Sequence, residues 1–213
     1  MYSRKVTQSQ YSYGWSAFIG GILWILYYVF DFAYGILEDH TSYQVANSPA
    51  LRITGPAYFG GVVLIGYALL GVYQLLNSKY KALSIPGLII GGIGTLAAIV
   101  GTIGTILSLC KVDFPQQVFN YVGPSILPVF VSAILLGIAS LKARTLPVNT
   151  AYLILVFGLT TLPLGLTIWK LMDNTVPNYW YDELHFVLAG IYWIKVGKVL
   201  QNPIKPKLST AIV

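Results

Sequence analysis

Two short segments combine histidine with carboxylates, the residue types that bind divalent metal ions. Glu38, Asp39 and His40 are consecutive, and His185 follows Asp182 by three positions, which would place both on one face of a helix. Imidazole and carboxylate ligands suit zinc and related ions. If the two segments meet in the fold, the candidate metal ligands are His40, Asp182, His185 and Glu38.

A simpler explanation of these residues stays open. The chain has only two histidines and no His-Glu-x-x-His motif, and acids or histidines at a helix start are also favoured by the helix dipole or by solvation. The single cysteine, Cys110, excludes an intrachain disulfide and a thiolate metal cluster. Nucleophile, phosphate-binding and haem-attachment motifs are absent, so no cofactor is implied, no catalytic residue is identified, and an enzyme is disfavoured.

Asp31 is a third candidate, because it is an acid inside a long apolar run. It lies about six residues before the predicted end of that run, roughly 9 Å along a helix axis. An acid at such a depth in a membrane is expected to face protein or water and to have a partner. Arg52, a tyrosine or His185 could serve, either as a structural ion pair or as part of a functional site.

The elements that would position these residues are long apolar helices. The chain of 213 residues is 56% hydrophobic and 9% charged, whereas soluble domains carry about 25% charged residues. A membrane-spanning helix needs about 20 mostly apolar residues. Six segments qualify, at about 15–37, 55–77, 84–109, 119–141, 147–169 and 180–200. The predicted fold class is all-α: a polytopic membrane bundle of six transmembrane helices forming a single transmembrane domain, residues 1–213.

Charged residues gather between the apolar segments and alternate in sign along the chain. One side of the predicted bundle holds ten of the thirteen Lys and Arg residues: Arg4, Lys5, Lys79, Lys81, Lys142, Arg144, Lys195, Lys198, Lys205 and Lys207. The other side holds the remaining three, together with all seven acids. Positive charge is retained in the cytoplasm during insertion. We therefore expect both termini in the cytoplasm of a cell (plasma or inner) membrane, and the net charge of +6 needs no nucleic-acid partner.

The third apolar segment is rich in glycine. Close helix packing in lipid favours small residues at helix contacts, so we expect helix-packing roles for Gly87, Gly91, Gly94, Gly101 and Gly104. The alternative is a flexible helix lining a pore, with only Thr95, Thr102, Thr105 and Ser108 as polar groups. Hydroxyls in helices also bond to their own preceding turn. Three prolines, Pro56, Pro86 and Pro147, are expected to open helices, where a missing N–H is harmless.

Two weaker patterns concern relatedness. The stretches LSLCK at 107–111 and LTIWK at 166–170 are alike, and their spacing of 59 residues is compatible with three hairpin repeats or simply with any regular six-helix chain. The segment LLGIASLKARTLPVNTAYLILVFGL at 135–159 resembles a hairpin of uncharacterised bacterial six-helix integral membrane proteins. That resemblance implies a helical membrane protein and no activity.

Three functions follow from these patterns. The favoured one is a non-catalytic structural or accessory subunit that packs in a larger membrane complex, with the lipid bilayer and other membrane chains as partners; aromatic residues at mid-depth, such as Trp24, Tyr67 and Trp193, could contact those chains or pigments. The second is a small transporter or channel for a neutral solute. The third is a membrane enzyme or metal-binding protein that uses the histidines and acids.

Overall fold

The computed structural model describes residues 8–38, 49–76, 79–159 and 179–202. Within its helices, the side chains at positions 8–9, 31–38, 49–53, 116 and 179–186 lie outside that description. Every regular element in the described residues is helical. The elements are α1 (Gln8–Glu38), α2 (Pro49–Leu76), α3 (Lys81–Leu109), α4 (Gln116–Val122), the 3-10 turn η1 (Gly123–Ser125), α5 (Ile126–Ala143), α6 (Val148–Leu159) and α8 (Tyr179–Gln201).

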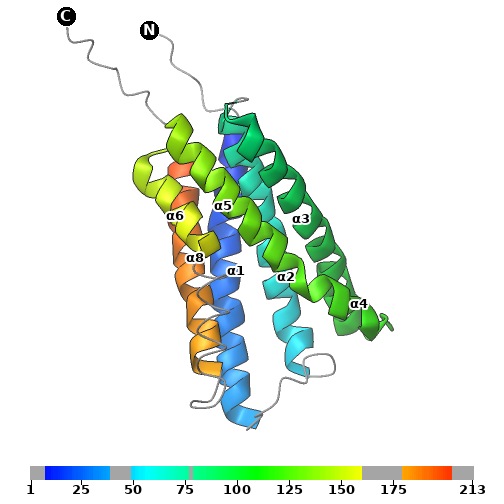
Figure 1. Ribbon diagram of the computed structural model, residues 1–213. Helices are drawn as coiled ribbons and strands as arrows, with labels where there is room; N and C mark the ends of the chain where they lie inside the picture. Colours follow the sequence, from blue (N-terminus) through cyan, green and yellow to red (C-terminus); the bar gives the residue numbers. More distant parts are fainter. Residues whose placement is uncertain (1–7, 39–48, 77–78, 160–178, 203–213) are drawn as a thin grey trace, which may run out of the picture.

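The long helices run side by side as rods (Figure 1). Each helix packs on its neighbour in the order α8, α1, α2, α3, α5, α6, and α6 returns to contact α8, so the bundle closes on itself. Helices α2 and α5 also touch across the middle. Helix α1 begins and α8 ends at the same end of the bundle, because Gly14 lies against Gln201.

Four stretches are long and apolar enough to cross a membrane, judged by length and composition. They are Gln10–Phe30, Thr54–Leu76, Lys81–Leu109 and Gln117–Ala143, the last running through α4, η1 and α5. Helix α6 is a shorter apolar helix as far as it is described, and most of the second half of the predicted span at 147–169 lies outside the described residues. The sequence-based prediction of an all-helical chain with membrane-length helices is therefore confirmed for these four.

Two predicted helix starts are wrong, and both errors come from proline. Pro56 and Pro86 lie inside α2 and α3, which begin at Pro49 and Lys81. Helix α3 starts earlier because Tyr80, in the left-handed conformation, accepts hydrogen bonds from the amides of Leu83 and Ser84 and so forms the first turn. Pro86 then follows in the second turn, where the helix continues despite the missing N–H. Pro147 does precede a helix, since its carbonyl accepts hydrogen bonds from the amides of Thr150 and Ala151 in the first turn of α6.

Glycines set the closest helix contact, between α1 and α8. A Cβ added to Gly14 would lie 2.9 Å from the carbonyl oxygen of Gly197, and one added to Gly190 would lie 2.6 Å from that of Gly21. The two pairs are each seven residues apart on antiparallel helices, which is about two turns, so both contacts lie on the same side of each helix. Any side chain at these positions would separate the helices, so glycine is required for this contact.

We predict that Gly21→Ala destabilises the folded protein, because the added methyl group meets the carbonyl of Gly190. Overpacking of this kind costs about 1–3 kcal/mol. The matched control is Gly60→Ala in α2, where the new methyl would meet only Leu23 Cδ1, at 3.6 Å. Thermal unfolding in detergent should show Gly21→Ala melting lower than wild type and Gly60→Ala melting no lower. Equal stability of the two variants would contradict the account of this contact.

Candidate functional site

The predicted metal and acid site lies largely beyond the described side chains. His40 is outside the described residues, and Glu38, Asp31, Arg52, Asp182 and His185 lie on helices whose backbones are described at these positions but whose side chains are not. The structure does place α1 against α8, which the metal hypothesis requires. Among the described side chains there is no group of three metal-binding residues. Metal binding at His40, Asp182, His185 and Glu38 stays a prediction.

The buried centre of the bundle is an aromatic cluster built from four helices. Trp24 of α1, Phe130 of α5, Phe157 of α6 and Trp193 of α8 are all at most 1% exposed. Phe157 lies 5.5 Å from Trp24 and 5.2 Å from Trp193 between ring centroids, and 4.9 Å from Phe130. Such offset and edge-to-face contacts stabilise a core beyond area burial. Trp24 and Trp193, which the sequence left as possible contacts for partners or pigments, are therefore core residues of this chain.

Trp24 also joins α1 to α2 through a glycine notch. The indole Nε1 of Trp24 donates a hydrogen bond to the carbonyl of Tyr58 at 3.3 Å. The same ring packs over Gly61, where an added Cβ would lie 2.6 Å from Nε1. The hydroxyl of Tyr58 donates in turn to the carbonyl of Gly123 at 3.2 Å. Gly123 opens the 3-10 turn between α4 and α5, so one side chain ties α2 to the break in the fourth membrane-length stretch.

The glycines of α3 face two different neighbours. Cβ atoms added to Gly87, Gly91 and Gly94 would meet α5 or η1, at Leu136 Cγ (3.1 Å), Ser132 Oγ (2.5 Å) and the Ser125 carbonyl (2.6 Å) respectively. Gly101 and Gly104 instead lie against the rings of Phe59 and Phe114. All five are buried. Along its first half, the backbone of helix α3 therefore packs closely against α5. Along its second half, it packs against aromatic rings.

Hydroxyl groups in this part of the bundle fall into two sets. Thr95, Thr102, Thr105 and Ser108 of α3 donate to carbonyls of their own preceding turn, at 2.7 to 3.0 Å. The second set has no hydrogen-bond partner although it is buried: Ser84 of α3, Ser125 of η1, and Ser132 and Ser140 of α5. A buried hydroxyl left without a partner costs about 1–3 kcal/mol. The sequence analysis missed this second set; the spacing of 125, 132 and 140, about two turns apart, was the available signal.

The charge distribution limits what this interior can do. Within the four membrane-length stretches the only ionisable Lys, Arg, Asp or Glu residues are Lys81 and Lys142, each at a helix end. The described interior can therefore hydrogen-bond neutral groups, but it provides no charged file for an ion or a proton.

We predict that Trp24→Ala lowers the stability of the fold strongly, because it empties the aromatic cluster and the notch at Gly61. Truncating a fully buried tryptophan costs about 3–5 kcal/mol. Trp15→Ala is the matched control, since Trp15 is 41% exposed and should cost much less. Unfolding monitored by circular dichroism in detergent measures both, and similar losses for the two variants would show that the cluster is not the core.

Comparisons with protein-family models, with curated proteins and with solved structures return no match to this chain. The resemblance of residues 135–159 to bacterial six-helix membrane proteins thus stays a prediction.

Proposed function

We propose that the chain is an integral protein of the cell membrane with six spanning helices and with both termini in the cytoplasm. Four membrane-length stretches support this, as do α6, which covers the first half of the fifth predicted span, and the 23-residue α8, which matches the sixth. Neighbouring helices in the chain pack against each other, which is the arrangement that successive spans with short connections would adopt. The three-hairpin repeat remains part of the proposal.

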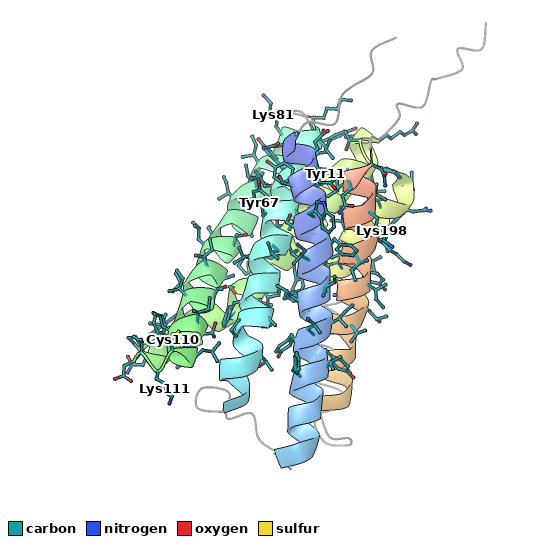
Figure 2. All side chains as sticks on the ribbon, turned by 180° about the vertical axis from the view of Figure 1, so that it is seen from behind. Tyr11, Tyr67, Lys81, Cys110, Lys111 and Lys198 are labelled. Atoms are coloured by element: carbon teal, nitrogen blue, oxygen red, sulfur yellow. The ribbon has the colours of Figure 1, made fainter. Side chains whose placement is uncertain are left out.

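The described charges support the proposed orientation. Lys81 and Lys198 lie toward the end of the bundle where α1 begins, whereas Cys110 and Lys111 lie at the opposite end (Figure 2). The first end carries six exposed basic side chains: Lys79, Lys81, Lys142, Arg144, Lys195 and Lys198. The second carries Lys111 and Asp113, which cancel in charge. An excess of positive charge at one end favours that end for the cytoplasm.

Within that membrane, we propose that the protein is a non-catalytic accessory subunit whose α3 packs on another membrane chain. The observation that carries this is the open face of α3. Only 28% of its most apolar stretch is buried, against 39%, 50% and 56% for the other three. Ile89, Ile93 and Leu96 are each more than half exposed.

A glycine on this open face favours a helix as its occupant. A Cβ added to Gly92 would have no atom within 4 Å, although Ile89, Ile93 and Leu96 project around it. Glycine between large side chains forms a notch that lets a second helix backbone approach closely, the arrangement by which helices associate in lipid. Lipid chains gain nothing specific from such a notch.

Cysteine cross-linking in the native membrane tests the partner. In a Cys110→Ser background, which removes the only native thiol, Leu96→Cys should form a cross-link to a different chain when it is labelled with a thiol-reactive photocross-linker and illuminated. Ile19→Cys on α1 is the matched control, because Ile19 is also mid-helix and 42% exposed. Electrophoresis followed by mass spectrometry should identify one recurrent partner for Leu96→Cys and none for Ile19→Cys.

Two results would contradict the accessory-subunit proposal. If Leu96→Cys stays at the monomer mass, lipid alone covers α3. If its adduct has twice the monomer mass and contains only this chain, the face joins two copies instead of serving another protein.

A further inference from the structure

The unpartnered hydroxyls form a row along one helix contact. Ser125 and Ser132 are seven residues apart and so share the side of η1 and α5 that faces α3, while Ser140, eight residues further on, is turned about 80° round the helix from Ser132. Ser132 shows the direction directly, since its Oγ would lie 2.5 Å from a Cβ on Gly91. The three serines are at most 4% exposed, and none has a hydrogen-bond partner.

Helix α3 adds a fourth hydroxyl in register with this row. Helices α3 and α5 are antiparallel. Gly94 lies opposite Val129, Gly91 opposite Ser132 and Gly87 opposite Leu136, so residue numbers fall along α3 as they rise along α5. The same register brings Ser84, which is fully buried and unpartnered, to the level of Ser140. We call the contact lined by Ser84, Ser125, Ser132, Ser140 and the three glycines the serine seam.

The state of these hydroxyls sets them apart from the others nearby. Thr102 and Ser108, on the same α3, donate to their own helix. The serine hydroxyls of the seam do not donate to their own helix. Each of these buried hydroxyls can therefore still donate and accept a hydrogen bond. The seam contains no charged side chain, so its hydrogen-bonding capacity suits uncharged molecules.

One end of the seam lies at a helix break. The 3-10 turn Gly123–Ser125 with Pro124 separates α4 from α5 at Ser125, whereas α3 continues through Pro86 at the other end. Helices interrupted in this way commonly mark solute sites in membrane proteins. At Gly87, Gly91 and Gly94 helix α3 contributes no side chain to the contact, so only side chains of α5 and η1 would have to move if the two helices parted there.

We propose that the serine seam opens to bind and pass a small uncharged solute that both donates and accepts hydrogen bonds, of the size of glycerol or urea. This activity goes beyond the accessory role and does not depend on it, because it uses the inner face of α3 and not the open one. The row runs from Ser125 to Ser84 and Ser140, which spans most of the length of α5.

Vesicle swelling tests the proposal. The purified full-length protein in liposomes, exposed to inward gradients of glycerol and of urea, should swell faster than protein-free vesicles in stopped-flow light scattering. Ser132→Ala combined with Ser140→Ala removes two hydroxyls with little change in volume, and we expect about five- to tenfold slower solute entry. Thr102→Ala combined with Ser108→Ala is the matched control and should leave the rate unchanged, because those hydroxyls serve their own helix.

A reversible cross-link gives a second reading that does not depend on hydroxyl loss. A Cβ on Gly87 would lie 3.3 Å from Leu135 Cβ, close to the separation of about 3.5–4.5 Å found in disulfides. In the Cys110→Ser background, Gly87→Cys with Leu135→Cys should therefore lock the seam when oxidised and release it when reduced. The control pair, Gly20→Cys with Leu64→Cys, is at 3.1 Å and locks α1 to α2 instead.

The expected result is solute entry that stops when the seam pair is oxidised, returns on reduction, and is unaffected by the control pair. Wild-type vesicles that swell no faster than protein-free ones would overturn the proposal. Swelling that persists with the seam locked, or that falls equally with the control variants, would overturn it as well.

Discussion

Hydrocarbon solvates neither a charge nor an unpaired backbone amide, and the rest of this structure depends on that constraint. It explains why the described elements are helices, which satisfy their amides internally. It also explains why Lys81 and Lys142 lie at helix ends and why the stretches between carry no charge. The excess of basic residues at one end is the basis of the proposed orientation, because membrane proteins retain positive charge in the cytoplasm when they insert.

For helices in lipid, burial of apolar area does not favour the packed bundle over separate helices, because lipid chains are also apolar. Close van der Waals contact between the helices therefore has to stabilise the bundle. The chain meets this requirement in two ways. Glycines at positions 14, 21, 190 and 197 let the backbones of α1 and α8 touch, and Gly61 makes room for Trp24. Rings from four helices then fill the centre around Phe157. Helix α3 uses its glycines toward α5 and leaves its other face open, so the two proposed activities occupy opposite sides of one helix.

The sequence predicted the helices better than their contacts. Long apolar runs determine where helices form, but not where they begin. The predicted start of α3 at Pro86 was wrong because Tyr80 forms the first turn, and a helix can continue past a proline in its second turn. The composition of α3 indicated close packing; that Gly91 meets Ser132 whereas Gly101 meets Phe59 depends on which helices become neighbours. The serine row was missed for the same reason, since whether a hydroxyl bonds its own helix depends on what faces it. The acids and histidines of the predicted metal site have no described side chains to compare.

The central claim is that the basic end of the bundle faces the cytoplasm and that α3 crosses the membrane between its ends. Cys110, the only cysteine, is exposed at the far end of α3, so a membrane-impermeant maleimide applied to intact cells measures the topology directly. The account predicts labelling of Cys110 in intact cells, whereas Lys81→Cys in a Cys110→Ser background is labelled only after the membrane is permeabilised. Labelling of Lys81→Cys but not Cys110 from outside would invert the orientation, and labelling of both from one side would show that α3 does not cross.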